Sequence, residues 1–377
     1  MALLINHKGK MKDKLKTPES VDIAITGKCN LSCKYCFYAD EMTALNDLPT
    51  ETWLNFFEEL RDAGVMRVCL SGGELFTRND LWELIDGIIK NKMRFSILTN
   101  GTLINDKAAS KLKKVRQRLD SIQVSIDGSS SGTHDKIRGK GSFKKMMEGV
   151  DNLKRNNLPF TVRSTINKLN VNDLKGILNL LYNDLNLKSF GINEAFPRGA
   201  GHCNHSSLDM TPDERHHSFK IMQEFDKEHP GVAKGVQSGP LIIADLIDKI
   251  DKARNSGTFD APYKTGHLTG CNIMWNKMSV LHDGTYVPCH QMSHIKLGKI
   301  GRDAFKNIWR NSSGLKLLRE RHKIPLESIS NCKKCDYKGY CTGGCPGIAY
   351  AITGEVNTIN PRDCYRAHIG EDPVYAY

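Results

Sequence analysis

Three cysteines lie close together near the N-terminus, at Cys29, Cys33 and Cys36, with the spacing C-x3-C-x2-C. Three thiolates on one loop can ligate three irons of a 4Fe–4S cluster. The fourth iron then has no protein ligand and is open to a substrate or a cofactor. The loop follows an alternating apolar stretch at 21–26, which predicts a strand. The loop is therefore expected at the end of a strand.

Seven further cysteines gather in the C-terminal part of the chain: Cys271, Cys289, Cys332, Cys335, Cys341, Cys345 and Cys364. Four of them have the spacing C-x2-C-x5-C-x3-C and are interleaved with glycines. Such a segment offers little apolar surface, so we expect metal to organise it. The spacing alone leaves zinc and iron–sulfur open. The first cysteine loop favours iron–sulfur clusters at these C-terminal cysteines, because such clusters could carry electrons to or from the first cluster.

The composition is that of a globular protein of 377 residues, with no apolar run long enough to cross a membrane. The N-terminal segment lacks the features of a secretory signal, so a cytoplasmic location is expected. Twelve cysteines in such a chain indicate metal binding rather than a disulfide framework. The net charge of +12 is compatible with solvated helix faces or with an anionic partner.

The elements that must position these cysteines follow an alternating β/α pattern. Strands are predicted at 21–26, 66–71, 94–99, 121–127, 160–167 and 188–193. Helices are predicted at 50–63, 79–92, 106–117, 142–156 and 171–185. This α/β pattern predicts a parallel sheet, open or curled into part of a barrel, with its ligand site at the carboxyl ends of the strands.

Two more helices should complete this part of the chain. A capping box at Thr211–Glu214 predicts a helix to about residue 229, and a second is expected at 240–255. Beyond this point the β/α pattern stops. We therefore divide the chain into a basic segment at 1–19, a barrel domain at 20–255 and a loop-rich, cysteine-rich domain at 256–377.

Both cysteine arrays resemble those of one enzyme family. The first loop, with Tyr35 before its last cysteine, is similar to the signature of the radical S-adenosylmethionine (SAM) superfamily. Gly72-Gly73-Glu74 resembles the family's Gly-Gly-Glu motif, with Leu75 where proline is usual. The C-terminal cysteines, together with Gly284, resemble the SPASM extension. The resemblance covers about 20–370 and implies a partial (β/α)6 TIM-like barrel followed by a small iron–sulfur domain.

The resemblance also implies the chemistry. SAM would bind the open iron of the cluster held by Cys29, Cys33 and Cys36, and reductive cleavage would give a 5′-deoxyadenosyl radical that removes a substrate hydrogen. Two auxiliary clusters, expected as 4Fe–4S, would divide the other cysteines. The distal cluster would use Cys332, Cys335, Cys341 and Cys364, and the nearer one Cys271, Cys289 and Cys345.

Contacts to SAM are implied for residues after the strands. The Gly-Gly-Glu motif would meet its amino group. Ser125 and Asp127 are candidates for its ribose or carboxylate, although Asp127 also suits a turn cap. Arg138 resembles an arginine that grips the SAM carboxylate, with a surface position as the alternative. Tyr35 and Asn100 are further candidates, and the segment Thr99–Gly101 also suits a plain turn.

Four other residues carry weaker expectations. The nearer auxiliary set has three cysteines, so one iron could be open to substrate or could have a further ligand. His267 and Cys203 are candidates for that ligand, and Cys203 also for a substrate contact; both also suit a plain loop. His290 stands where sulfatase-maturating relatives carry an acidic base, so it is a candidate general base. Cys69 is expected to be a buried core thiol.

The SPASM extension usually accompanies peptide or protein modification. We therefore expect a maturase that forms a thioether or carbon–carbon cross-link in a ribosomally made peptide. The alternatives are a formylglycine maturase of the anaerobic sulfatase type and a maturase of a peptide-derived redox cofactor of the pyrroloquinoline quinone or mycofactocin type. A metal-organised nucleic-acid-binding protein is the non-enzyme alternative, supported only by charge.

The expected partners follow from this reading. They are the peptide or protein substrate, an electron donor such as flavodoxin or ferredoxin, and a separate leader-binding protein. Met1–Ser20, which precedes the first strand, is too short for a leader-binding domain, so leader recognition would need a separate protein or another surface. No membrane partner is expected.

Overall fold

The computed structural model describes residues 15–235, 239–258, 266–268, 271 and 273–369. Most of the predicted segment 1–19 and of the predicted boundary near 255–265 lies outside these residues, so these domain limits stay predictions. Among the described residues, no helix combines the length and the apolar character needed to span a membrane.

One ten-stranded sheet organises the chain, in the order β10-β9-β8-β1-β2-β3-β4-β5-β6-β7. All neighbours from β8 to β7 are parallel, and β9 and β10 add an antiparallel meander at one edge. The strands are β1 Ser20–Thr26, β2 Arg67–Gly72, β3 Arg94–Thr99, β4 Leu119–Ser125, β5 Phe160–Ile166, β6 Phe190–Glu194, β7 Ala233–Gly235, β8 Lys277–Val280, β9 Thr285–Val287 and β10 Gly298–Lys299.

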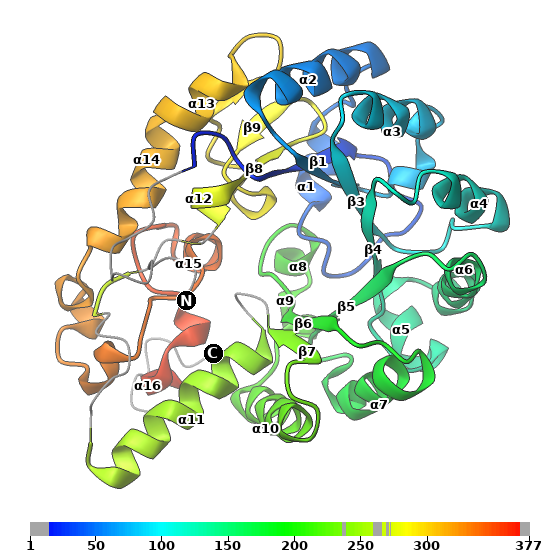
Figure 1. The fold of residues 1–377 in the computed structure, drawn as a ribbon. Coiled ribbons are helices and arrows are strands. Elements are labelled where there is room, and N and C mark those ends of the chain that lie inside the picture. Colours follow the sequence, from blue (N-terminus) through cyan, green and yellow to red (C-terminus); the bar gives the residue numbers. More distant parts are fainter. Residues whose placement is uncertain (1–14, 236–238, 259–265, 269–270, 272, 370–377) are drawn as a thin grey trace.

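Helices cover the outside of the curled sheet, and the C-terminal residues lie at its open side (Figure 1). The helices are α1 Ala39–Ala44, α2 Thr50–Ala63, α3 Leu81–Lys90, α4 Asp106–Lys114, α5 Ser131–Arg138, α6 Ser142–Arg155, α7 Leu174–Asn179, α8 Ala200–Cys203, α9 His205–Leu208, α10 Pro212–Glu228, α11 Pro240–Ser256, α12 Ile273–Asn276, α13 Phe305–Asn311, α14 Ser313–Glu320, α15 Pro346–Thr353 and α16 Tyr365–His368.

Local sequence explains the long helices. In α2, Trp53, Phe56, Phe57 and Leu60 recur at helical spacing and are all buried against the sheet. Gly64 ends this helix in the left-handed conformation, with φ of 85°. The predicted capping box at the start of α10 is confirmed. These helices therefore begin and end where the sequence predicts.

The sheet also differs from the predicted one in extent. Strand β8 lies beside β1 and extends the sheet with residues from the C-terminal part. The predicted helix at 171–185 is a short 3-10 turn, then α7, then a π-helical segment at Leu180–Asp184. Residues beyond 256 thus supply part of the barrel as well as the cysteine-rich region.

Candidate active site

The first cysteine loop occupies the segment between β1 and α1, at the carboxyl end of the sheet. Its three thiols are free and partly buried. Burial raises the pKa of Cys36 to about 11, and repulsion from Cys33 and Cys29 adds to this. Among the described residues, no three His, Cys, Asp or Glu side chains form a site for a single metal ion. The three cysteines lie close enough that Cys33 raises the pKa of both Cys29 and Cys36, which suits a larger multi-iron group.

The Gly-Gly-Glu segment packs directly on the start of this loop. The Gly73 N–H donates to the Thr26 carbonyl and the Glu74 N–H to the Lys28 carbonyl, both at 2.8 Å. A Cβ atom would lie 2.3 Å from Thr26 O at Gly72 and 2.2 Å from Lys28 O at Gly73. The two glycines are therefore required here because the backbones meet, whatever else they contact.

Glu74 is wholly buried and joins the ends of two strands. Its Oε1 accepts the Thr99 hydroxyl at 2.8 Å, and its Oε2 accepts the Asn100 N–H at 2.8 Å. Burial raises the pKa of Glu74 to about 7. The Asn100 side chain in turn donates to Asn30 Oδ1 at 3.0 Å, inside the cysteine loop. The predicted contact of Glu74 and Asn100 with SAM stays a prediction.

Tyr35, Asp127 and Arg138 form one buried cluster. The Tyr35 hydroxyl donates to Asp127 Oδ2 at 2.5 Å, and the Arg138 guanidinium donates to both. Arg138 also points Nη1 toward Cys33 Sγ, at 3.9 Å. The alternative of a surface position for Arg138 is wrong, because only 7% of the residue is exposed. The guanidinium therefore holds the cysteine loop against α5.

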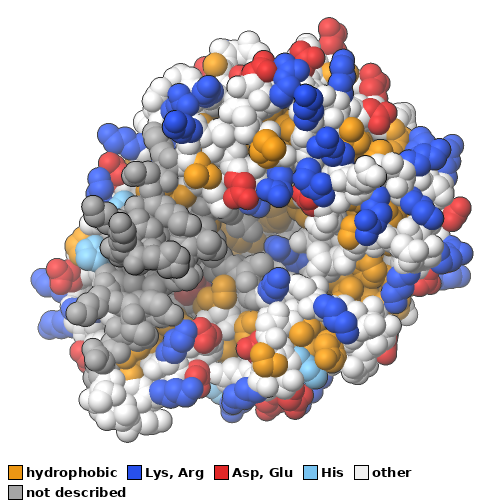
Figure 2. Space-filling model, viewed as in Figure 1, with side chains coloured by type: hydrophobic (Ala, Val, Ile, Leu, Met, Phe, Trp, Pro, Cys, Tyr) orange, Lys and Arg blue, Asp and Glu red, His pale blue; other side chains and the backbone are white. Residues whose placement is uncertain are grey.

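The concave face of the sheet forms a polar lumen below this loop. Half-buried Cys69 and Ser71 alternate on β2 with buried Val68 and Leu70, and β4 shows the same alternation, with Ser125 on the half-buried face. Figure 2 shows the molecule hollowed near its centre, with Lys and Arg beside the hollow. The expectation of a buried thiol at Cys69 is confirmed in part: burial raises its pKa to about 12, but the residue lies on the half-buried face of β2 and bonds to Ser96.

The curl of the sheet brings distant strands together across the lumen. Arg163 on β5 interacts electrostatically with Cys69 on β2 and Asp22 on β1, although β3 and β4 separate these strands in the sheet. Sequence reasoning did not single out Arg163 or Asp22 as site residues. The available signal was a single charged residue within each strand, Asp22 in β1 and Arg163 in β5.

The C-terminal cysteines fall into two groups. Burial raises the pKa of Cys289, and repulsion from Cys271 and Cys345 raises it further. A separate apolar cavity is lined by the other four: Cys332, Cys335, Cys341 and Cys364. These are the two sets that the resemblance implied, and the structure brings each set together.

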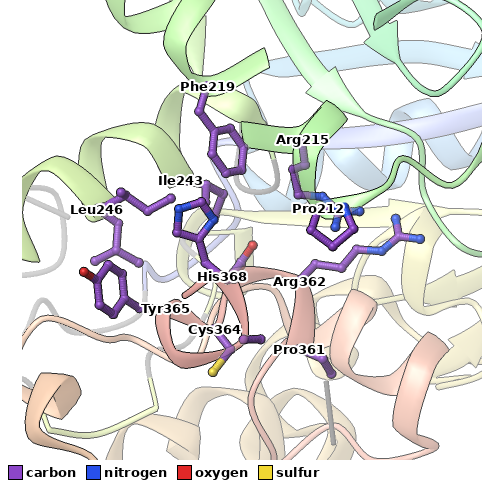
Figure 3. Close-up of a pocket in the computed structure, with 13 residues that line it drawn as sticks. Pro212, Arg215, Phe219, Ile243, Leu246, Pro361, Arg362, Cys364, Tyr365 and His368 are labelled. Carbon is purple, nitrogen blue, oxygen red and sulfur yellow. The ribbon is translucent and has the colours of Figure 1, made fainter. Parts of the chain in front are cut away.

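A second cavity lies on the other side of the Cys364 segment, between α10, α11 and α16. Figure 3 shows Phe219, Ile243 and His368 meeting there, while the sulfur of Cys364 points away from them. Arg215 and Arg362, at its edge, are both ion-paired with Glu194. This cavity contains no second cysteine among its lining residues, so it is a packing space behind the distal set.

The remaining predicted residues lie apart from one another. Cys203 is exposed at the end of α8, and His267 forms an isolated bridge to Pro325. His290 directs Nε2 to the Val280 carbonyl at 3.1 Å. That contact occupies one ring nitrogen of His290, and its role as a general base stays a prediction.

A charged network that the sequence did not reveal connects the two cysteine regions. Arg198 donates to Glu41, which lies on α1 just after the first loop, and to Ser293, which follows Cys289. Ser293 also donates to Glu41. Helix α8 lies against the first loop, where the Ala200 N–H donates to the Cys36 carbonyl at 2.9 Å. The loop is thus held from both sides.

Comparison with known proteins identifies both regions. Residues 23–181 match the model described as the radical SAM superfamily, and 271–336 match the SPASM model, described as an iron–sulfur cluster-binding domain.

Three curated proteins are similar over most of the chain. The AdoMet-dependent heme synthase of Methanosarcina barkeri is 27% identical, over 93% of this chain and 97% of that protein. The Fe-coproporphyrin III synthase of the same organism is 29% identical, over 90% and 86%. The antilisterial bacteriocin subtilosin biosynthesis protein AlbA of Bacillus subtilis is 26% identical, over 87% and 67%.

A solved structure has the same fold. Streptococcus suis SuiB, bound to its precursor peptide SuiA, superimposes with a TM-score of 0.68 at 16% identity, covering 93% of this chain and 77% of SuiB.

Proposed function

We propose that this chain, which belongs to the radical SAM superfamily and carries a SPASM iron–sulfur domain, cross-links a ribosomally made peptide. The product would be a thioether or a carbon–carbon bond. The observation that carries the proposal is the half-exposed polar lumen below the first cysteine loop. Hydroxyl and amide side chains there, such as Ser71, Gln123 and Asn193, can satisfy the main-chain groups of an entering peptide.

The cofactors of the family fit the residues present. Cys29, Cys33 and Cys36 would hold the SAM-binding 4Fe–4S cluster, because three free thiols share one loop with no disulfide among the described cysteines. The two C-terminal groups would hold auxiliary clusters. When bound, the cluster at the first loop supplies the electron that cleaves SAM.

The chain's own residues would orient and enclose the reaction. Arg138 and Asp127 fix the cysteine loop through Tyr35, and Glu74 fixes the neighbouring strand ends. Phe37 and Phe196, with ring centroids 6.3 Å apart, close the apolar side of the loop next to α8. A fixed, partly enclosed loop favours attack on the substrate over side reactions with water.

The proposal is tested by anaerobic co-expression with each short reading frame that lies next to this gene. Mass spectrometry should show the loss of two hydrogen masses for each cross-link. The matched Cys33→Ala variant should return the peptide unchanged. A peptide that keeps its full mass with the wild-type enzyme contradicts cross-linking.

A porphyrin carboxylic acid is a second candidate substrate. It is favoured by the names of two similar proteins, a heme synthase and an Fe-coproporphyrin III synthase, and by an unpartnered lumen cation, Arg163. The strand residues that face the lumen carry no aromatic ring in the described part of the chain, which disfavours a large flat ligand. Turnover of coproporphyrin III by the reconstituted enzyme, with no change to the peptide, would replace the first candidate by the second.

A further inference from the structure

Arg163 is a lumen cation whose guanidinium makes no hydrogen bond to a described residue. It lies on β5, between Ser125 of β4 and Gly191 of β6 in the register. Its Nε is buried with no hydrogen-bond partner, and no described residue forms an ion pair with its guanidinium. Gly191 leaves room for the group, since a Cβ atom there would lie 3.6 Å from Nε.

The charges around Arg163 leave an excess of positive charge. Burial raises the pKa of Cys69 to about 12, so this neighbouring thiol is neutral at pH 7. Asp22 is the nearby acid, and it is shared with Lys277 at 3.9 Å. Two cations therefore face one carboxylate in this part of the lumen.

Other buried arginines of the chain are not left in this state. Each has a carboxylate or carbonyl partner: Arg138 with Asp127, Arg198 with Glu41, Arg215 and Arg362 with Glu194, and Arg319 with the Met274 carbonyl. Burying a guanidinium without a partner is costly. Arg319 also has one buried nitrogen without a partner, Nη2, but its Nε and Nη1 donate to carbonyls. No described residue accepts a hydrogen bond from Arg163, which leaves a position there for an external anion.

We propose that Arg163 binds a carboxylate of the substrate. The proposal rests on the proposed function, and it names the class of substrate as a carboxylate-bearing molecule. The planar fork of arginine suits two parallel hydrogen bonds to a carboxylate.

The position of Arg163 relative to the reaction is defined by its strand. Thr165, two residues further along β5, donates its N–H to Asp127 at 2.7 Å, and Asp127 holds the first cysteine loop through Tyr35. Arg163 therefore lies about 7 Å along the strand below that contact. A carboxylate held there places the adjoining carbon chain of the substrate beneath the loop.

Binding measurements on the anaerobically reconstituted full chain test this proposal. The probes are a short synthetic peptide that contains Asp and Glu, the same peptide with Asn and Gln in their place, coproporphyrin III, and its tetramethyl ester. We expect one acid form to bind about tenfold or more tightly than its neutral counterpart. The probe that shows this difference separates a peptide carboxylate from a porphyrin carboxylate.

Variants assign the effect to the guanidinium. In Arg163→Gln the affinity for the acid form should fall to near the affinity for the neutral form. Arg163→Lys should keep part of the difference between the two affinities. Arg116→Gln is the matched control, because Arg116 is an exposed arginine that donates to the Asn157 carbonyl. The proposal is overturned if Arg163→Gln keeps the wild-type difference in affinity between acid and neutral forms. It is also overturned if the wild-type protein binds each acid form no more tightly than its neutral counterpart.

A second readout separates this proposal from the proposed function. Release of 5′-deoxyadenosine from SAM without substrate should be the same in Arg163→Gln and wild type, which also shows that the variant folds. If Arg163→Gln does not fold, the same affinities measured for Arg163→Lys and for wild type test whether Arg163 binds a carboxylate. If wild type releases no 5′-deoxyadenosine, the proposed function is contradicted. The affinity measurements would still test whether Arg163 binds a carboxylate.

Discussion

At the scale of single residues, the buried cluster of Tyr35, Asp127 and Arg138 is the most informative feature of the site. Each was predicted separately as a contact to SAM. The structure shows that they bond to one another and that Arg138 faces Cys33. Residue types and positions after strands were enough to single them out. Their mutual contacts depend on how α5 folds back over the loop, which sequence spacing does not contain.

Arg138→Met should weaken both the fold and the first cluster. Removing the cation leaves Asp127 buried and uncompensated, at a cost of about 3–5 kcal/mol. Loss of a positive donor beside Cys33 should also make the cluster harder to reduce. Thermal unfolding and a redox titration followed by electron paramagnetic resonance measure the two effects. Unchanged stability together with an unchanged potential would contradict the assigned role, and Arg116→Met is the control.

Glu74 should make stability depend on pH. Its pKa is about 7 in the folded chain, against an ordinary value of 4.5. The folded state therefore binds the proton more tightly, and stability should fall as pH rises from about 4.5 to about 7, by roughly 2–3 kcal/mol. Glu74→Gln should flatten this slope in denaturant unfolding of the cluster-free chain. The exposed Glu83→Gln should keep it; an equal slope in all three proteins would contradict the account.

At the scale of elements, the helices and strands were largely predictable, and the exceptions have physical causes. Strand β8 has four residues, and it is ordered by pairing with β1, more than 250 positions away in the sequence. Short strands of this kind carry too little periodicity to be recognised. Helix α5 was not predicted because its eight residues are mainly polar and it is held by contacts of His134 and Arg138.

The contact between the Gly-Gly-Glu segment and the cysteine loop makes a prediction at this scale. Gly73→Ala should displace Lys28 and thereby the adjoining Cys29, because the new Cβ would lie 2.2 Å from a backbone oxygen. We expect lower iron content and a destabilisation of a few kcal/mol. Gly132→Ala on α5 is the control, since its Cβ would meet Ser130 only at 3.5 Å. Iron retention and an unchanged melting temperature in Gly73→Ala would contradict this packing.

At the scale of the whole molecule, the cysteines that the sequence arranged in two arrays occupy three places in space. The two C-terminal groups interleave along the chain, since Cys345 lies between Cys341 and Cys364 and yet interacts with Cys271. Spacing alone does not determine which of these cysteines share a cluster. The resemblance to a family supplied the grouping before the structure did.

Single substitutions should remove the auxiliary clusters one at a time. Cys341→Ala and Cys345→Ala should each lower iron and sulfide by roughly a third of the wild-type content. The double variant should lose about two thirds, because the sites are separate. Cys203→Ala should lose none, since Cys203 is exposed at the end of α8. Equal loss in a single and the double variant would show that the seven cysteines form one site.

Transfer of deuterium shows directly whether the radical made at the first cysteine loop removes a hydrogen from a peptide. The peptide that co-expression identifies as modified is prepared with deuterium on its carbon atoms and incubated with SAM, reductant and the reconstituted chain. The account predicts deuterium in the 5′-deoxyadenosine released. 5′-Deoxyadenosine that forms and carries no deuterium would contradict it.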